Sequence, residues 1–260
     1  MSQIIDPLKI GRRTVLSPAV QNEVELHDDH PCASCAVRER ALCGVLDADD
    51  LASYRRLGWT LRLKRGQTIF HEGDPATRVF TVTGGTVKLY TLLPDGRRQV
   101  TGFMFPGDFL GISLDEEHAV SAEALDDVQL CWFPRNRFGK FVDQHPVMER
   151  QLYCLAAHEL AAARQQMVLL GRKTALERVA TFFIQLLERS ERVGAGGKGC
   201  FDLPMGRSDI ADYLGLTKET VSRVLGQLRD LRMIRLVTLD RIMVLDRTGL
   251  GLLADGAGQA

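Results

Sequence analysis

Residues 206–230 carry the most restrictive pattern in the chain, because they predict two short helices joined by a tight corner. The first helix is expected at 208–214, with Ser208 as its N-cap. A turn is expected at 215–216, and the second helix begins after Thr217 as its N-cap. The apolar residues of the second helix recur at helical spacing: Val221, Val224, Leu225 and Leu228.

The opposite face of the second helix suits a DNA-reading helix-turn-helix. In that motif the second helix presents its N-terminal residues to base edges, while the first lies across the backbone. Arg223 could form two hydrogen bonds with guanine, Glu219 could accept one from cytosine, and Ser222 could serve either partner. The other candidate DNA contacts are Lys218, Ser208 and Thr217. The alternative is an ordinary solvated helix face.

Two apolar runs that follow favour the DNA-binding interpretation. Residues 233–236 and 242–245 are joined by a polar turn at 240–241, which is typical of the β-hairpin wing of a winged helix-turn-helix. The chain as a whole has no net charge, but residues 172–247 contain 14 Lys and Arg against 10 Asp and Glu. A mildly basic segment is compatible with contact to phosphates.

The preceding part of the chain predicts a β-domain. Residues 59–133 contain short runs of alternating apolar residues separated by glycine-containing turns, which indicates an antiparallel roll or barrel. Pro94-Asp95-Gly96 is expected to be the turn of a hairpin between Tyr90 and Val100.

Residues 138–170 predict a long helix with a narrow apolar stripe. The stripe is typical of a two-helix seam and consists of Leu152, Ala156, Leu160, Ala163, Met167 and Leu170. A homodimer along this seam would supply the two-fold symmetry that paired DNA half-sites require. The alternative is a helix that packs on its own domain. No acidic residue lies at 162–163 in the middle of the seam, so we expect the cofactor-free protein to dimerise more readily.

The chain is therefore predicted to be an α+β protein with an N-terminal antiparallel β-roll, a long dimerisation helix and a C-terminal winged helix-turn-helix. No run of about 18 apolar residues and no signal-peptide pattern is evident, so we expect a cytoplasmic protein with no membrane contact. No nucleophile–base set or phosphate loop points to an enzyme. The expected segments are an irregular arm at 1–30, a cysteine-rich loop and roll at 31–145, the dimerisation helix at 146–171, the DNA-binding domain at 172–249 and a tail at 250–260.

The six cysteines indicate metal or redox chemistry, because disulfide frameworks are rare in the cytoplasm. Cys32, Cys35 and Cys43 form a C-x2-C-x7-C run. Together with His27 or His30 they could make a closed zinc site. They could also act as redox-switched thiols, or hold an iron–sulfur cluster, which usually needs four thiolates.

Over about residues 32–247 the chain resembles the Crp/Fnr family of bacterial transcription regulators. The resemblance is carried by IFHEGDPATRVFTVTGGTVKLYTLLPDGRRQVTGFMFPGDFLG in the roll and by YLGLTKETVSRVLG in the DNA-reading unit. Glu219, Ser222 and Arg223 look like the Glu-x-x-Ser-Arg signature of the Fnr-type branch. The resemblance implies a roll of the cyclic-nucleotide-binding type, a homodimer that reads inverted TTGAT-type half-sites in double-stranded DNA, and RNA polymerase as a partner.

The resemblance also implies the sensor. It assigns Cys131 as the fourth ligand of an oxygen-labile [4Fe-4S] cluster with Cys32, Cys35 and Cys43, in a regulator of anaerobic or microaerobic genes. Cys154 and Cys200 are then expected to be structural. A cyclic nucleotide is not expected, because the acidic pocket residue is Asp108 and no arginine lies between 110 and 124 to bind a phosphate.

Overall fold

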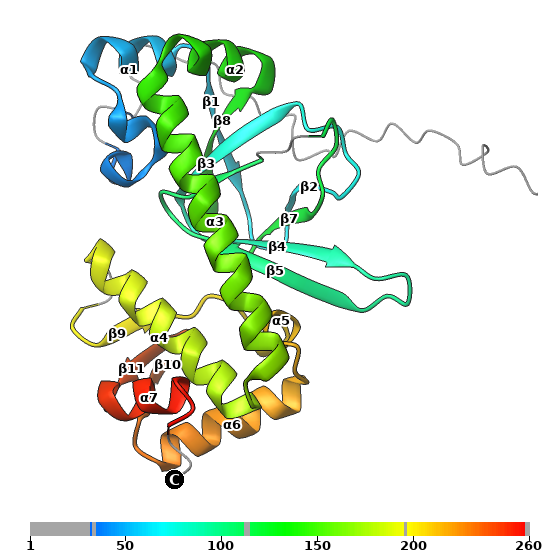
Figure 1. The fold of residues 1–260 in the computed structure, drawn as a ribbon, viewed down its shortest axis with the longest axis vertical. Coiled ribbons are helices and arrows are strands. Elements are labelled where there is room, and N and C mark those ends of the chain that lie inside the picture. Colours follow the sequence, from blue (N-terminus) through cyan, green and yellow to red (C-terminus); the bar gives the residue numbers. More distant parts are fainter. Residues whose placement is uncertain (1–31, 33–34, 112–114, 195–196, 258–260) are drawn as a thin grey trace, which may run out of the picture.

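The computed structural model describes residues 32, 35–111, 115–194 and 197–257. The β-roll and the C-terminal domain lie at opposite ends of the molecule, and one long helix, α3 (Pro146–Arg172), runs past both (Figure 1). The predicted fold class is confirmed.

The roll consists of two four-stranded antiparallel sheets. The strand orders are β1-β8-β3-β6 and β2-β7-β4-β5. The strands are β1 (Trp59–Leu63), β2 (Thr68–Phe70), β3 (Arg78–Gly84), β4 (Val87–Leu92), β5 (Arg98–Met104), β6 (Phe109–Leu110), β7 (Ser121–Ala124) and β8 (Val128–Pro134). The predicted hairpin is confirmed: Tyr90 of β4 pairs with Val100 of β5, and Gly96 in the turn has a φ of 84°, which favours glycine.

A second core lies on the outer face of the first sheet. Successive residues of a strand point to opposite faces, so Leu130 and Trp132 of β8 pack inside the roll, whereas Cys131 and Phe133 face outward. The outer face is covered by two 3-10 turns and two helices: η3 (Arg38–Arg40), η4 (Leu42–Val45), α1 (Ala48–Arg55) and α2 (Arg135–Gln144).

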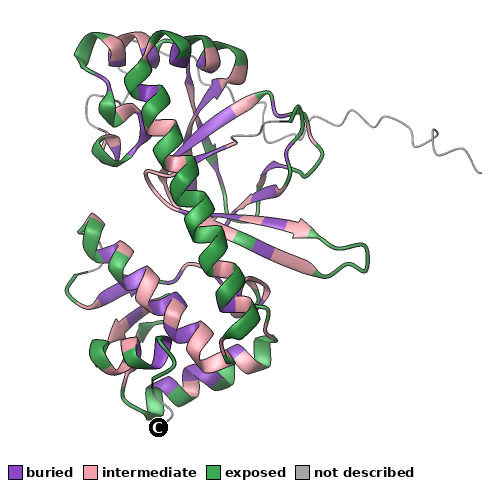
Figure 2. Ribbon diagram, in the orientation of Figure 1, coloured by how far each residue is buried: buried purple, intermediate pink, exposed green. Residues whose placement is uncertain are grey.

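The helical region expected over 138–170 consists of two helices. α2 ends at Gln144, and α3 begins at Pro146 after His145. Proline lacks the backbone N–H that a helix interior needs but fits the first helical position, so the chain restarts there. Burial along α3 is concentrated near its ends, at Met148 and Leu169, and its middle is exposed (Figure 2).

The C-terminal domain is a winged helix-turn-helix. Its core is formed by α4 (Ala175–Val193), whose N-terminus is capped by Thr174 and Glu177. The wing hairpin is present, and its strands belong to a sheet of order β10-β11-β9. The remaining elements are β9 (Cys200–Asp202), α5 (Arg207–Leu214), α6 (Lys218–Asp230), β10 (Ile234–Thr238), β11 (Arg241–Val244) and α7 (Arg247–Ala254).

Two local expectations were wrong. Ser208 is not the N-cap of the first helix of the motif: α5 is capped at Gly206, whose N–H donates to the Asp209 carboxylate at 3.2 Å, and Ser208 lies within the first turn. Residues 250–254 are not a tail, because they belong to α7. Leu250, Leu253 and Ala254 are buried in the core of the domain, and the Lys173 ammonium donates to the Ala254 carbonyl at 2.9 Å.

Candidate nucleic-acid interface and cysteine site

The polar face of α6 is open to solvent at every position that the sequence singled out. Val221 and Leu225 anchor the opposite face in the domain core. Thr217 is the N-cap, as predicted, and its hydroxyl accepts from the Thr220 N–H at 3.2 Å. The exposed candidates are Thr217, Lys218, Glu219, Ser222 and Arg223 on or before α6, together with Ser208 on α5.

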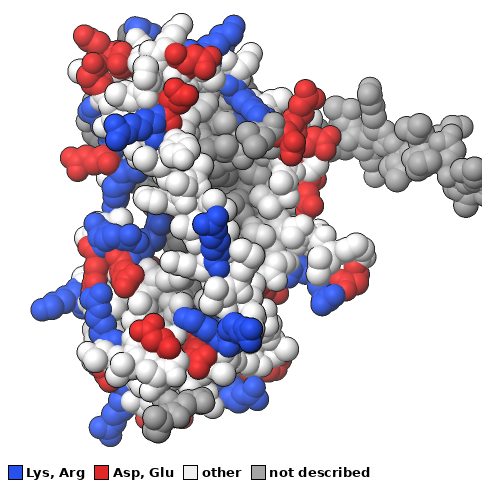
Figure 3. Space-filling view, viewed as in Figure 1, with Lys and Arg blue, Asp and Glu red and all other residues white. Residues whose placement is uncertain are grey.

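The charges of this face suit base recognition. Hydrogen bonds from its own backbone amide and from Thr217 lower the pKa of Glu219, so its carboxylate remains ionised and able to accept from an amino group. The Ser222 hydroxyl donates to the Lys218 carbonyl at 3.0 Å, which leaves its lone pairs outward. On the face of the molecule seen in Figure 3, acidic and basic side chains are intermixed.

The four cysteines assigned to the cluster line one narrow cavity, although they are far apart in sequence. Cys131 is held on β8, where it pairs with Thr60 of β1 and Thr81 of β3. Three further cysteines enter from the loop before and within η3 and η4: Cys32, Cys35 and Cys43. The rest of the lining includes Arg38, Leu51, Tyr54, Thr81, Thr83 and Phe133.

Burial in the cavity raises the pKa of Cys32, Cys43 and Cys131 and so favours their protonated form. Burial, followed by the charges of the other three cysteines, raises the pKa of Cys131 to about 12. Burial and the same kind of repulsion raise the pKa of Cys32 to about 11, against the opposing effect of Arg55 and Arg38. Burial also raises the pKa of Cys43. Thiols of this kind react slowly as nucleophiles, and a metal that bound them would have to displace protons.

Within the described residues, no three His, Cys, Asp or Glu side chains are grouped so as to hold one metal ion. His27 and His30, the histidines of the zinc alternative, lie outside the described residues. None of the six described cysteines is joined in a disulfide.

The two remaining cysteines lie outside this cavity. Cys200 is buried on β9, where its carbonyl accepts from the Ser190 hydroxyl at 3.0 Å, in keeping with a packing role. Cys154 is exposed on α3, so it does not pack in this subunit as the sequence suggested.

The apolar stripe of α3 is divided between its own subunit and solvent. Leu152 packs partly against the outer core of the roll, and Leu170 against the core of the C-terminal domain. Between them the side chains of Leu160 and Met167 are 54% and 66% exposed, and Ala156 and Ala163 are exposed as well. The predicted seam is therefore uncovered in its middle and partly occupied at its ends.

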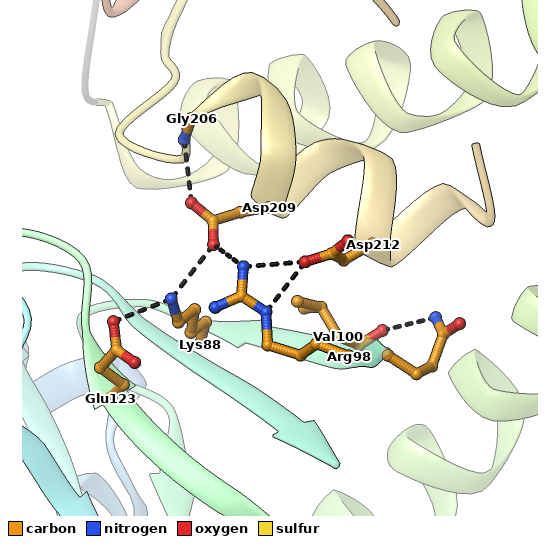
Figure 4. Close-up of polar contacts among 8 residues, drawn as sticks. Lys88, Arg98, Val100, Glu123, Gly206, Asp209 and Asp212 are labelled. Carbon is orange, nitrogen blue, oxygen red and sulfur yellow. Dashed lines mark hydrogen bonds and ion pairs between the residues drawn. The ribbon is translucent and has the colours of Figure 1, made fainter. Parts of the chain in front are cut away.

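A polar network that the sequence did not reveal joins the roll to the helix-turn-helix (Figure 4). The Lys88 ammonium on β4 lies 2.8 Å from Glu123 and 3.1 Å from Asp209 of α5. The Arg98 guanidinium on β5 donates to Asp209 at 3.0 Å and to Asp212 at 2.8 Å. The pairs that join the roll to α5 are more than 100 residues apart in sequence, so no local pattern could have predicted them.

Asp108, the acidic residue at the position where the family binds a ribose, is engaged within the chain. One carboxylate oxygen accepts from Arg189 of α4 at 2.8 Å, and the other accepts from the Phe105 N–H at 2.9 Å. The contact with Arg189 therefore joins the roll to the C-terminal domain. This arrangement is compatible with the expectation that no cyclic nucleotide binds.

Comparison with known proteins agrees with these features. The chain matches the family described as Cyclic nucleotide-binding domain over residues 60–145 and the Crp-like helix-turn-helix domain over residues 177–253. It is 46% identical over 199 residues to the nitrogen fixation regulation protein FixK of Bradyrhizobium diazoefficiens, which covers 76% of this chain and 84% of that protein. It is 42% identical over 212 residues to the transcriptional activatory protein AadR of Rhodopseudomonas palustris, which covers 82% and 88%.

The structure of FixK2 from Bradyrhizobium japonicum aligns with a TM-score of 0.71 and 38% identity, covering 75% of this chain and 96% of that one. The relatives are regulators and not enzymes, as the sequence predicted. Within the described residues, no helix is long and apolar enough to cross a membrane. With both domains matched and the α6 face exposed, the chain belongs to the Crp/Fnr family of DNA-binding transcription regulators.

Proposed function

We propose that this protein is a homodimeric transcription activator that reads inverted TTGAT-type half-sites and senses oxygen through a [4Fe-4S] cluster. The observation that carries the sensing part is the convergence of Cys32, Cys35, Cys43 and Cys131 on one cavity. Activation is supported by the relative that is named a transcriptional activatory protein, and it implies contact with RNA polymerase. The expected targets are genes for anaerobic or microaerobic growth, and the expected location of the protein is the cytoplasm.

DNA reading is assigned to the N-terminal half of α6. Arg223 recognises a guanine, and Glu219 accepts a hydrogen bond from a cytosine amino group. Ser222 forms a hydrogen bond with a donor or an acceptor on a neighbouring base. Lys218, Ser208 and Thr217 lie at the edge of this surface and contact phosphates or neighbouring bases. All six side chains are exposed, so they meet DNA without any rearrangement of the domain.

Dimerisation is assigned to the uncovered middle of α3. Leu160, Met167 and the small residues Ala156 and Ala163 recur at the spacing that lets two helices pack closely, and they are exposed in the single subunit. A second copy of the chain related by a two-fold axis would bury this stripe. The same symmetry would place two α6 helices for an inverted repeat.

The cysteine cavity is assigned to the cluster. The four thiols supply the donor set that iron–sulfur clusters require, and Arg38 and Arg55 lower the pKa of Cys32, which offsets part of the negative charge of the ligands. When bound, such a cluster supplies a centre that oxygen can oxidise and dismantle. The raised pKa of Cys131 means that its sulfur returns to a neutral thiol when the site is empty.

The outer core of the roll provides a physical link between this cavity and α3. Cys43 and Cys131 border the same apolar cluster that contains Met148 and the partly buried Leu152 and Leu155 of α3. A change in the cysteine loop therefore alters the surface on which the N-terminal half of α3 packs. Coupling of about 1–3 kcal/mol between ligand state and dimer geometry would change DNA occupancy several-fold or more.

Anaerobic purification tests the proposal. We expect about four irons and four sulfides per subunit, a broad absorbance near 400 nm, and tight binding to a TTGAT palindrome that declines after exposure to air. Cys131→Ser should abolish iron uptake, and Cys154→Ser is the matched control because Cys154 lies outside the cavity. Zinc without iron or sulfide would contradict the cluster. If exposure to air changed DNA binding in neither Cys131→Ser nor Cys154→Ser, oxygen sensing would be contradicted.

A further inference from the structure

The hydroxyl of Tyr54 on α1 is a buried donor without an acceptor. Tyr54 is 3% exposed, and its hydroxyl is the one buried side-chain N or O atom in the described part of the chain that has no hydrogen-bond partner there. Buried polar groups in folded proteins are nearly always paired, because an unpaired one loses its hydration without compensation. An orphaned hydroxyl in a core therefore calls for a functional explanation.

The ring of Tyr54 is packed among three aromatic side chains. It stacks on Phe133 with ring centroids 4.3 Å apart, and it contacts Phe141 and Phe138 at 5.2 Å and 6.4 Å. Phe133 belongs to β8, two residues after Cys131, and shares its outward face. The aromatic packing thus fixes the ring beside the cysteines, and Tyr54 lines their cavity.

The polar atoms around the cavity do not satisfy this donor. The Thr83 hydroxyl donates to the Gln129 carbonyl at 3.0 Å. Neutral cysteine thiols are weak acceptors, whereas thiolates and sulfides are anionic and accept strongly.

We propose that Tyr54 is a positioning residue whose hydroxyl donates a hydrogen bond to an anionic sulfur of the cluster, either a cysteine thiolate or a bridging sulfide. The inference rests on the proposed function of the cavity. A hydrogen bond to sulfur stabilises the more negatively charged, reduced state of a cluster and so raises its reduction potential. This hydrogen bond also exists only in the protein that carries the cluster, because the empty site offers the Tyr54 hydroxyl no strong acceptor.

The test is Tyr54→Phe, which removes the hydroxyl and keeps the ring. Tyr90→Phe is the matched control, because Tyr90 is also buried in the roll but lies on β4 and outside the cysteine cavity. Both variants and the wild type are reconstituted anaerobically. Iron and sulfide content, the midpoint potential from a redox titration, and the rate at which the 400 nm absorbance is lost in air are then measured, together with the melting temperature of the metal-free protein.

We expect Tyr54→Phe to assemble the cluster, to have a more negative midpoint potential and to lose the cluster several-fold faster in air. The metal-free variant should melt at a higher temperature than the metal-free wild type, because an unpaired buried hydroxyl has been removed. Tyr90→Phe should match the wild type in potential and in air sensitivity. The melting temperature also shows that Tyr54→Phe has folded.

Two results overturn the inference, and they are distinguishable. A wild type that takes up no iron or sulfide refutes the proposed function and the role of Tyr54 together. A wild type that carries the cluster, with Tyr54→Phe equal to it in potential and air-loss rate, refutes the role of Tyr54 alone. Equal changes in Tyr54→Phe and Tyr90→Phe would likewise refute a specific hydrogen bond.

Discussion

Arg98 of the β-roll and Asp212 of the helix-turn-helix form a two-point ion pair across the domain boundary. Both Nε and Nη2 of Arg98 lie 2.8 Å from Oδ2 of Asp212. The pair adjoins the Lys88–Asp209 contact, so the roll holds the first helix of the DNA-reading motif at two positions. Paired guanidinium hydrogen bonds are strongly directional. The network therefore sets the orientation of α5 on the roll.

Lys88→Met is expected to lower the free energy of unfolding by about 2–3 kcal/mol, somewhat less than the loss of a fully buried pair. The Lys88 side chain is 5% exposed, and its removal leaves Glu123 and Asp209 without their shared cation. Urea denaturation measures the change. Lys64→Met is the control, because the Lys64–Asp127 pair is 79% and 69% exposed and should contribute within about 1 kcal/mol. Equal losses in both variants would show that burial of Lys88 is unimportant.

Stability should fall as pH rises above about 6.5, in part through His145. A hydrogen bond to the Phe141 carbonyl and an ion pair with Asp50 at 3.2 Å raise the pKa of His145. A raised pKa means that the folded state binds the proton more tightly than the unfolded chain. The stabilisation is therefore complete below the unfolded pKa and is lost as pH passes the folded pKa.

His145→Asn should flatten this part of the pH profile, as measured by urea unfolding at several pH values. The pKa of His118 is lowered by burial, so that residue acts in the opposite sense and destabilises the fold as pH falls. The difference between wild type and His145→Asn isolates one residue. An unchanged difference between pH 6 and pH 8 would contradict the prediction.

Arg223→Ala should weaken binding to the half-site by about 1–3 kcal/mol and relax discrimination at one base pair. The guanidinium is exposed and bound only weakly within the helix, at 3.4 Å from the Thr220 hydroxyl, so it is available to guanine. Fluorescence anisotropy with matched and single-substituted sites measures both effects. Arg229→Ala, an exposed arginine in the last turn of α6, is the control and should leave base preference unchanged.

Leu160→Glu should shift the protein toward monomer in analytical ultracentrifugation without lowering the melting temperature of the subunit. A charge in the middle of a helix seam opposes pairing, and Leu160 makes no core contact in its own subunit that would be lost. Leu252→Glu is the control, because Leu252 on α7 is exposed to nearly the same extent, 53% against 54%. A metal-free wild type that is already monomeric at micromolar concentration would contradict the expected seam.

Local elements of this protein could be predicted from sequence because their causes lie within a few residues. Thr217 caps α6 through the N–H of a residue three positions later. The β4–β5 hairpin depends on Gly96, which adopts the positive φ that its turn requires. The exposed face of α6 and the stripe of α3 follow from helical periodicity. The N-cap of α5 was missed because the Asp209 carboxylate caps the helix at Gly206. The helix over 247–254 was missed because it forms by packing against α4, which is remote in sequence.

Sequence alone therefore determined the order of parts and the presence of the winged helix-turn-helix. Only the tertiary structure decided which groups meet across distance. It brought Cys131 to the loop that carries Cys32, it left the Tyr54 hydroxyl unpaired beside them, and it joined Arg98 to Asp212. The physical reason is that burial and pairing depend on the packing of strands and helices that are remote in the chain, and no short pattern records that packing.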